Sequence, residues 1–211
     1  LAMNKLEKKK ILNFLTKNPE EFSFARIKQI DILKKIKALR YMEDKEIAHA
    51  IIDFYFEENI SSLESQKLKI KKIKSTTAKI KHLLQYQLEL DFEKKDFLKK
   101  VFLFLSSEKK FPQIVDYFFR TSSQMWVLAG DTATDINYYS KRLILSSVYS
   151  KVFIKLMSFP NYQKIMIEKD IDASLSNVRK FNDIKSKICS ADILSVFKKF
   201  QSSSESTGRG F

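Results

Sequence analysis

Few residues in this sequence could carry acid–base or metal chemistry. His49 and His82 are the only histidines, and Cys189 is the only cysteine. Glu46 and His49 have the Glu-x-x-His spacing of di-iron helical bundles, in which one helical turn directs both ligands inward. Such a bundle also needs a second Glu-x-x-His motif, which the sequence lacks. We therefore interpret the pair as a coincidence on an amphipathic helix, and we predict no catalytic residue, no metal site and no cofactor.

Glycine is scarce, and this excludes a further group of binding sites. The only three glycines are Gly130, Gly208 and Gly210, so a glycine-rich loop that cradles the phosphates of ATP or NAD cannot form. Asp131 and Asp135 lie four residues apart, but both stand where a helix is expected to start. A helix N-terminus favours carboxylates, so capping explains the two aspartates better than a catalytic pair does.

The composition predicts an all-α fold. Hydrophobic residues make up 44% of the 211 residues, which is enough apolar material for a core or a cavity. With three glycines and three prolines the chain lacks the turn residues of a hairpin-rich β fold, whereas long helices need few breaks. The single cysteine excludes an intramolecular disulfide and fits a reducing compartment. The net charge of +14 indicates either a well-solvated lysine-rich surface or an anionic partner.

Periodicity and breakers place the expected helices in the first half of the chain. Residues 4–15, 23–39 and 44–56 read as three short helices, an arrangement that suits a helix-turn-helix unit. Residues 65–88 contain seven lysines and no acidic residue, with an apolar stripe at helical spacing, and predict one long amphipathic helix. Its basic face either is simply solvated or docks on an anionic surface. Residues 94–105 predict a further helix.

The second half has clearer boundaries. Pro112 suits the first turn of a helix, and Gly130 suits the left-handed residue that ends one. Thr132 and Asp135 form a capping-box pattern for a helix that continues to about Met157. A mixed-charge helix is expected over 161–181. Residues 183–200 predict a basic amphipathic helix, which either lies in a membrane interface or packs on the body of the protein.

Aromatic residues and methionines are dense between residues 118 and 157. Apolar side chains cover much of the circumference of the helix over this stretch. Such a helix is expected either to be buried on all sides in the core or to have core on one side and an apolar ligand or partner on the other.

The segment 126–149 reads WVLAGDTATDINYYSKRLILSSVY and resembles the ninth coenzyme Q biosynthesis protein family. That family has Trp, Ala-Gly-Asp, Thr-Asp, Asn-Trp-Tyr, a basic pair, Leu and Val-Tyr in this order. The matching residues here are Trp126, Ala129, Gly130, Asp131, Thr134, Asp135, Asn137, Tyr139, Lys141, Arg142, Leu145, Val148 and Tyr149. Tyr138 replaces the family's usual Trp, Lys141 replaces the usual Arg, and the N-terminal third matches only in its helical pattern.

The resemblance implies a fold and a function. The fold would be a TetR-regulator-like helical domain of about nine helices plus a C-terminal amphipathic helix. The function would be that of a non-catalytic accessory protein of ubiquinone biosynthesis that forms a homodimer and binds isoprenoid lipid or a ubiquinone intermediate. It would present that lipid to the di-iron demethoxyubiquinone hydroxylase at the membrane.

The resemblance also implies sites and a location. The partner-binding residues would be Met125, Asn137, Tyr138, Tyr139 and Arg142. The lipid-binding residues would be Phe118, Trp126, Leu145, Val148, Tyr149 and Val152. The membrane-contact residues would be Ile193, Val196, Phe197 and Phe200. The protein would be cytoplasmic and peripheral at the inner face of the membrane, or in the mitochondrial matrix of a eukaryote.

The expected layout has four parts. Residues 1–60 are degenerate helix-turn-helix-like helices, 61–182 a lipid-binding and dimerisation domain, 183–200 the amphipathic helix and 201–211 a disordered tail. The charge and the N-terminal unit leave open an alternative function, a TetR-type DNA-binding transcriptional regulator. That alternative needs side chains that read base edges, and only Arg26 and Gln29 are candidates.

Overall fold

The computed structural model describes residues 4–34, 36–134 and 136–185, and these residues form helices and no strands. The expected all-α class is therefore confirmed for this part of the chain. No helix in the described ranges is long and apolar enough to cross a membrane. The expected membrane-contact residues Ile193, Val196, Phe197 and Phe200 lie outside these ranges, as do the tail and most of the expected last helix.

The N-terminal region differs from the expected three helices. The first and third are present as α1 (Lys5–Lys17) and α3 (Asp44–Ser62), but the expected helix over 23–39 is broken. It is replaced by two 3-10 helices, η2 (Phe24–Gln29) and η3 (Lys37–Tyr41), with the four-residue α2 (Asp31–Lys34) between them. Arg26 has non-helical backbone angles inside η2. The described residues thus contain no continuous second helix that could enter a DNA groove.

The expected helix over 65–88 is also broken. The chain forms η4 (Leu63–Gln66), α4 (Lys67–Lys71) and then α5 (Thr76–Glu93). Ser75 is extended and its hydroxyl accepts a hydrogen bond from the backbone N–H of Ala78 at 3.4 Å, so it caps a new helix instead of continuing the old one.

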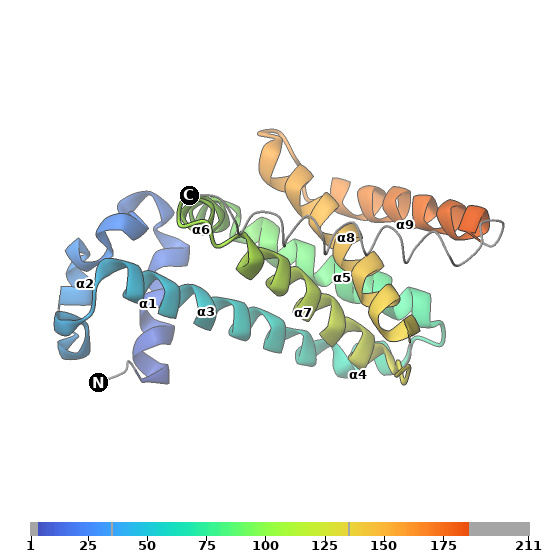
Figure 1. Cartoon of the computed structure of the whole chain (residues 1–211), viewed down its shortest axis with the longest axis horizontal. Coiled ribbons are helices and arrows are strands. Elements are labelled where there is room, and N and C mark those ends of the chain that lie inside the picture. The colour runs from blue at the N-terminus through green and yellow to red at the C-terminus, as the bar shows by residue number, and fades with distance from the viewer. Residues whose placement is uncertain (1–3, 35, 135, 186–211) are drawn as a thin grey trace, which may run out of the picture. The chain divides into compact units, whose positions relative to one another are not determined.

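The remaining helices begin and end close to the predicted places. They are α6 (Lys95–Ser107), α7 (Phe111–Ala129), α8 (Ile136–Ser158) and α9 (Met166–Lys185). Residues 161–165 form turns and irregular backbone, so the last of these helices starts later than expected. In Figure 1, α7 and α8 pack along each other and α5 lies against both.

The chain divides into two compact units, 1–171 and 172–211. The first contains α1 to α8, the start of α9 and the hydrophobic core, in which aromatic side chains from α3, α6, α7 and α8 meet. Of the second unit, the described residues are the remainder of α9.

Candidate functional site at the corner between α7 and α8

Gly130 builds the corner between α7 and α8. Its φ of 89° lies in the left-handed region, where a residue without Cβ is favoured. The backbone N–H of Gly130 donates to the carbonyl of Val127, and that of Asp131 donates to the carbonyl of Trp126, both at 3.0 Å. These two bonds satisfy the last carbonyls of α7 as a Schellman motif does, so the predicted role of Gly130 is confirmed.

Asp131 links this corner to the first turns of α8. Its carboxylate accepts hydrogen bonds from Lys141 Nζ at 2.7 Å and from Arg142 Nη1 at 3.1 Å. The bond from Lys141, followed by that from Arg142, holds the pKa of Asp131 below its usual value although burial acts against it. Asp131 is thus an ion-pair partner and not the helix cap that we expected. Asp135, the expected cap partner of Thr132, lies outside the described residues.

Arg142 is the centre of the corner. It is only 1% exposed, and its guanidinium donates to Ser123 Oγ at 3.0 Å and to the carbonyl of Tyr138 at 2.9 Å, besides pairing with Asp131. The same group lies 3.4 Å from the centre of the Tyr138 ring. A buried guanidinium with this many partners fixes the groups around it, and removing Asp131 would leave its buried charge without compensation.

Trp126 and Lys141 form the second link between the two helices. The indole Nε1 of half-buried Trp126 donates to the carbonyl of Lys141 at 3.1 Å, and Lys141 Nζ lies 5.4 Å from the ring centre. Trp126 and Asp131 on one side of the corner are therefore bonded to Lys141 and Arg142 on the other side. All four are residues of the motif described above.

The outer face of α8 beside this corner is apolar and exposed. Ile136 is 78% exposed, Tyr139 60% and Leu143 42%, and their spacing of three and four residues puts them on one face of the helix. Val127, at the end of α7, is 55% exposed. We call Ile136, Tyr139 and Leu143 the α8 face. Exposed apolar groups on a rigid support are typical of a surface that another molecule covers.

The structure separates the five expected partner-binding residues. Tyr139 and Asn137 are exposed and Tyr138 is half-buried, whereas Arg142 and Met125 are buried at 1% and 0% exposure. Arg142 and Met125 therefore support the corner from inside and do not lie on its surface. The sequence motif did not indicate Ile136 and Leu143, although helical spacing from Tyr139 would have found them.

The expected lipid-binding residues lie together in the core. Phe118, Leu145, Val148, Tyr149 and Val152 are at most 6% exposed, whereas Trp126 is half-buried. The rings of Phe118 on α7 and Tyr149 on α8 meet edge to face at 4.8 Å. A lipid chain could pass between these two rings only if they moved apart.

A buried polar cluster next to these residues was not predicted. Asp91 on α5 is fully buried and accepts hydrogen bonds from Tyr149 Oη on α8 and from Asn59 Nδ2 on α3, the latter at 3.3 Å. Tyr117 Oη on α7 lies 2.6 Å from Asn59 Nδ2 and 3.2 Å from Tyr149 Oη. Burial raises the pKa of Asp91 to about 6, and the hydrogen bond from Tyr149 acts against that rise. The cluster ties four helices together.

The Glu46 and His49 pair has ordinary structural partners. Glu46 accepts a hydrogen bond from the backbone N–H of Glu43 at 3.0 Å and completes a capping box at the start of α3. His49 packs its ring on Phe104, with centres 5.3 Å apart. No group of three or more potential metal ligands occurs within the described ranges.

Comparison with known proteins supports the family resemblance over this region. Residues 111–182, which include α7, the corner and α8, match the model of the COQ9 family. Neither the curated proteins nor the solved structures gave a match to the chain. The TetR-like arrangement of the helices therefore stays a prediction.

Proposed function

We propose that this chain, whose residues 111–182 match the COQ9 family model, is a non-catalytic accessory protein that delivers lipid in ubiquinone biosynthesis. The family match supports the connection with that pathway. The finer proposal is that it binds an isoprenoid or quinone intermediate and presents it to the di-iron demethoxyubiquinone hydroxylase at a membrane. We further propose that the α8 face, together with Asn137 and Tyr138, docks on the hydroxylase.

The locked corner is the observation that carries this proposal. Asp131, Lys141 and Arg142 form an ion-pair network across the corner, and their charges mostly point inward. The α8 face beside this network is exposed. A rigid support lowers the entropy that an exposed side chain loses on binding, and a tyrosine with apolar neighbours is a frequent centre of protein interfaces.

Lipid binding is the second part of the proposal. The aromatic rings of Phe118 on α7 and of Tyr149 and Phe153 on α8 pack against one another, further along α8 than the proposed docking surface. A lipid that separates α7 from α8 would replace contacts between apolar side chains by contacts with its own chain, at little cost in buried apolar area. Organic extraction of the purified protein followed by mass spectrometry should yield an isoprenoid or quinone, and extraction of none would contradict lipid binding.

A pair of substitutions on α8 tests the docking surface. Tyr139 and Ile154 are both 60% exposed on α8, but Ile154 lies more than three turns away from the corner. Tyr139→Ala should weaken binding to the purified hydroxylase by about tenfold or more, whereas Ile154→Ala should change it by less than about twofold. The dissociation constants are measured by titration calorimetry. Equal effects of the two substitutions would show that the partner does not bind at this corner.

A further inference from the structure

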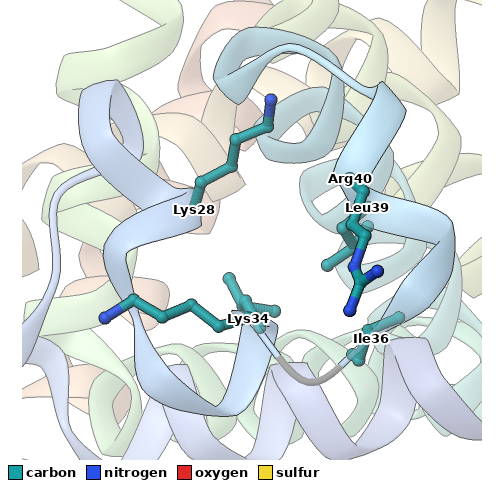
Figure 2. A pocket seen from close by; sticks show the side chains of 6 residues that line it. Lys28, Lys34, Ile36, Leu39 and Arg40 are labelled. Atoms are coloured by element: carbon teal, nitrogen blue, oxygen red, sulfur yellow. The ribbon is translucent and has the colours of Figure 1, made fainter.

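A small basic pocket lies in the N-terminal region, far along the chain from the corner. Its lining consists of the apolar side chains Leu33, Ile36 and Leu39 and the three cationic residues Lys28, Lys34 and Arg40. In Figure 2 the guanidinium of Arg40 turns toward the hollow beside Ile36 and the side chain of Lys28 extends along the facing side, whereas the nitrogen of Lys34 points away from the hollow. The pocket thus combines an apolar floor with a cationic rim.

The broken backbone of residues 23–41 creates this pocket. Leu33 and Leu39 are 2% and 3% exposed, so they anchor α2 and η3 in the core. The backbone N–H of Lys28 donates to Asp44 Oδ1 at 2.7 Å, which fixes the end of η2 to the start of α3. The backbone around the hollow is therefore held at three points, Leu33, Leu39 and the bond from Lys28 to Asp44.

The charge around the rim favours an anion. Lys34 pairs with Asp31 at 2.7 Å, in an exposed pair whose attraction water largely screens. The carboxylate of Asp44 is already engaged by the backbone of Lys28. With Lys34 turned to Asp31, the side chains of Lys28 and Arg40 leave a positive rim, and the planar fork of Arg40 suits the oxygens of a phosphate.

The surroundings favour a lipid phosphate over other phosphates. Tyr41, next to Arg40, is 87% exposed, and an exposed tyrosine beside basic residues is typical of the headgroup level of a membrane. The volume of about 220 Å³ is below the roughly 300–1,000 Å³ of sites for drug-sized ligands, so it suits one headgroup and not a whole lipid. The four residues of α2 are too few to read bases in a DNA groove.

We propose that Lys28 and Arg40, at the rim of the pocket over Leu33, Ile36 and Leu39, bind the phosphate of an anionic phospholipid. The N-terminal short helices then dock on a membrane surface. This inference is independent of the proposed docking corner, because no residue is shared between the two sites.

Vesicle binding by the full chain tests the inference. The Lys28→Gln, Arg40→Gln double variant removes two rim charges and keeps both the backbone bond to Asp44 and the Lys34 pair with Asp31. The Lys110→Gln, Lys151→Gln double variant removes two exposed charges outside the N-terminal region and outside the basic stretch 65–88, and it is the control with the same net charge. Circular dichroism and thermal unfolding confirm that both variants fold.

Binding is measured by co-sedimentation with phosphatidylcholine vesicles, with and without phosphatidylglycerol. The pocket variant should lose about tenfold or more of its affinity for the anionic vesicles, and the control about twofold or less. Equal losses would overturn the inference, since net charge alone would then explain the binding. So would a pocket variant that binds vesicles normally but loses affinity for inorganic phosphate or for duplex DNA, because the pocket would then serve a free phosphate or a nucleic acid.

Discussion

At the scale of single residues, Gly130 and Arg142 decide the geometry of the corner. Gly130 supplies a left-handed backbone that ends α7, and Arg142 fixes the start of α8 against it through Asp131 and Tyr138. The glycine could be predicted because it is the only one before residue 208 and stands at the end of an apolar helix pattern. The pairing of Asp131 with a residue eleven positions later could not, because it exists only once the chain has turned.

Substitutions at Gly130 should reveal backbone strain without any steric clash. A Cβ at this position would meet no atom within 4 Å, so the left-handed φ is the only obstacle. Gly130→Ala should lower the free energy of unfolding by about 1 kcal/mol, because non-glycine residues are disfavoured in this region. Gly130→Asn should cost less, since asparagine tolerates the conformation. Urea denaturation measures both, and an alanine variant as stable as the parent would contradict the strain argument.

At the scale of elements, the N-terminal half shows where periodicity misleads. Apolar residues at helical spacing continue across 23–39 and across 65–88, so the pattern predicted two unbroken helices. In residues 23–39, both Leu33 and Leu39 are buried in the core, and the backbone changes direction between them. In residues 65–88, Ser75 before two threonines is a capping signal. It was not predicted from the sequence because the lysine-rich helical pattern continues on both sides. Helices with a proline, a glycine or a cap at their ends, such as α7, were predicted closely.

The start of α3 gives a prediction that separates capping from metal binding. The carboxylate of Glu46 accepts a hydrogen bond from the backbone N–H of Glu43, and the side-chain oxygen of a glutamine can accept the same bond. Glu46→Gln should therefore leave the unfolding free energy nearly unchanged, whereas Glu46→Ala should lower it by about 1 kcal/mol. If Glu46 were a metal ligand, both substitutions would reduce the metal content of the purified protein. Thermal unfolding and elemental analysis of the two variants distinguish these cases.

At the scale of the whole molecule, the buried cluster around Asp91 joins α3, α5, α7 and α8. It was not predictable, because Asp91 lies in a charged stretch of sequence and is buried only when Asn59, Tyr117 and Tyr149 arrive from other helices. An ionised carboxylate in this position has lost its hydration, and hydrogen bonds from neutral groups compensate that loss only in part.

The position of Asp91 makes the stability of the bundle depend on pH in a defined direction. Burial raises its pKa from 3.8 to about 6, so between these values the folded protein binds more protons than the unfolded chain. The contribution of Asp91 is therefore full below about pH 4 and is lost as the pH rises through about 6. The size of this effect is on the order of 3 kcal/mol, because one unit of pKa shift corresponds to about 1.4 kcal/mol.

Asp91→Asn isolates this effect from the other titrating groups. The groups that face Asp91 are Tyr55, Tyr117 and Tyr149, whose pKa values burial raises, and Lys94, whose pKa burial lowers. The raised tyrosine values lie above the acidic range, so these residues stay neutral there. Unfolding free energies of both proteins, measured by urea denaturation from about pH 4 to about pH 7, should show that the stability of the parent relative to the variant falls as the pH rises. A constant difference between the two proteins across this range would show that Asp91 does not titrate in the folded bundle.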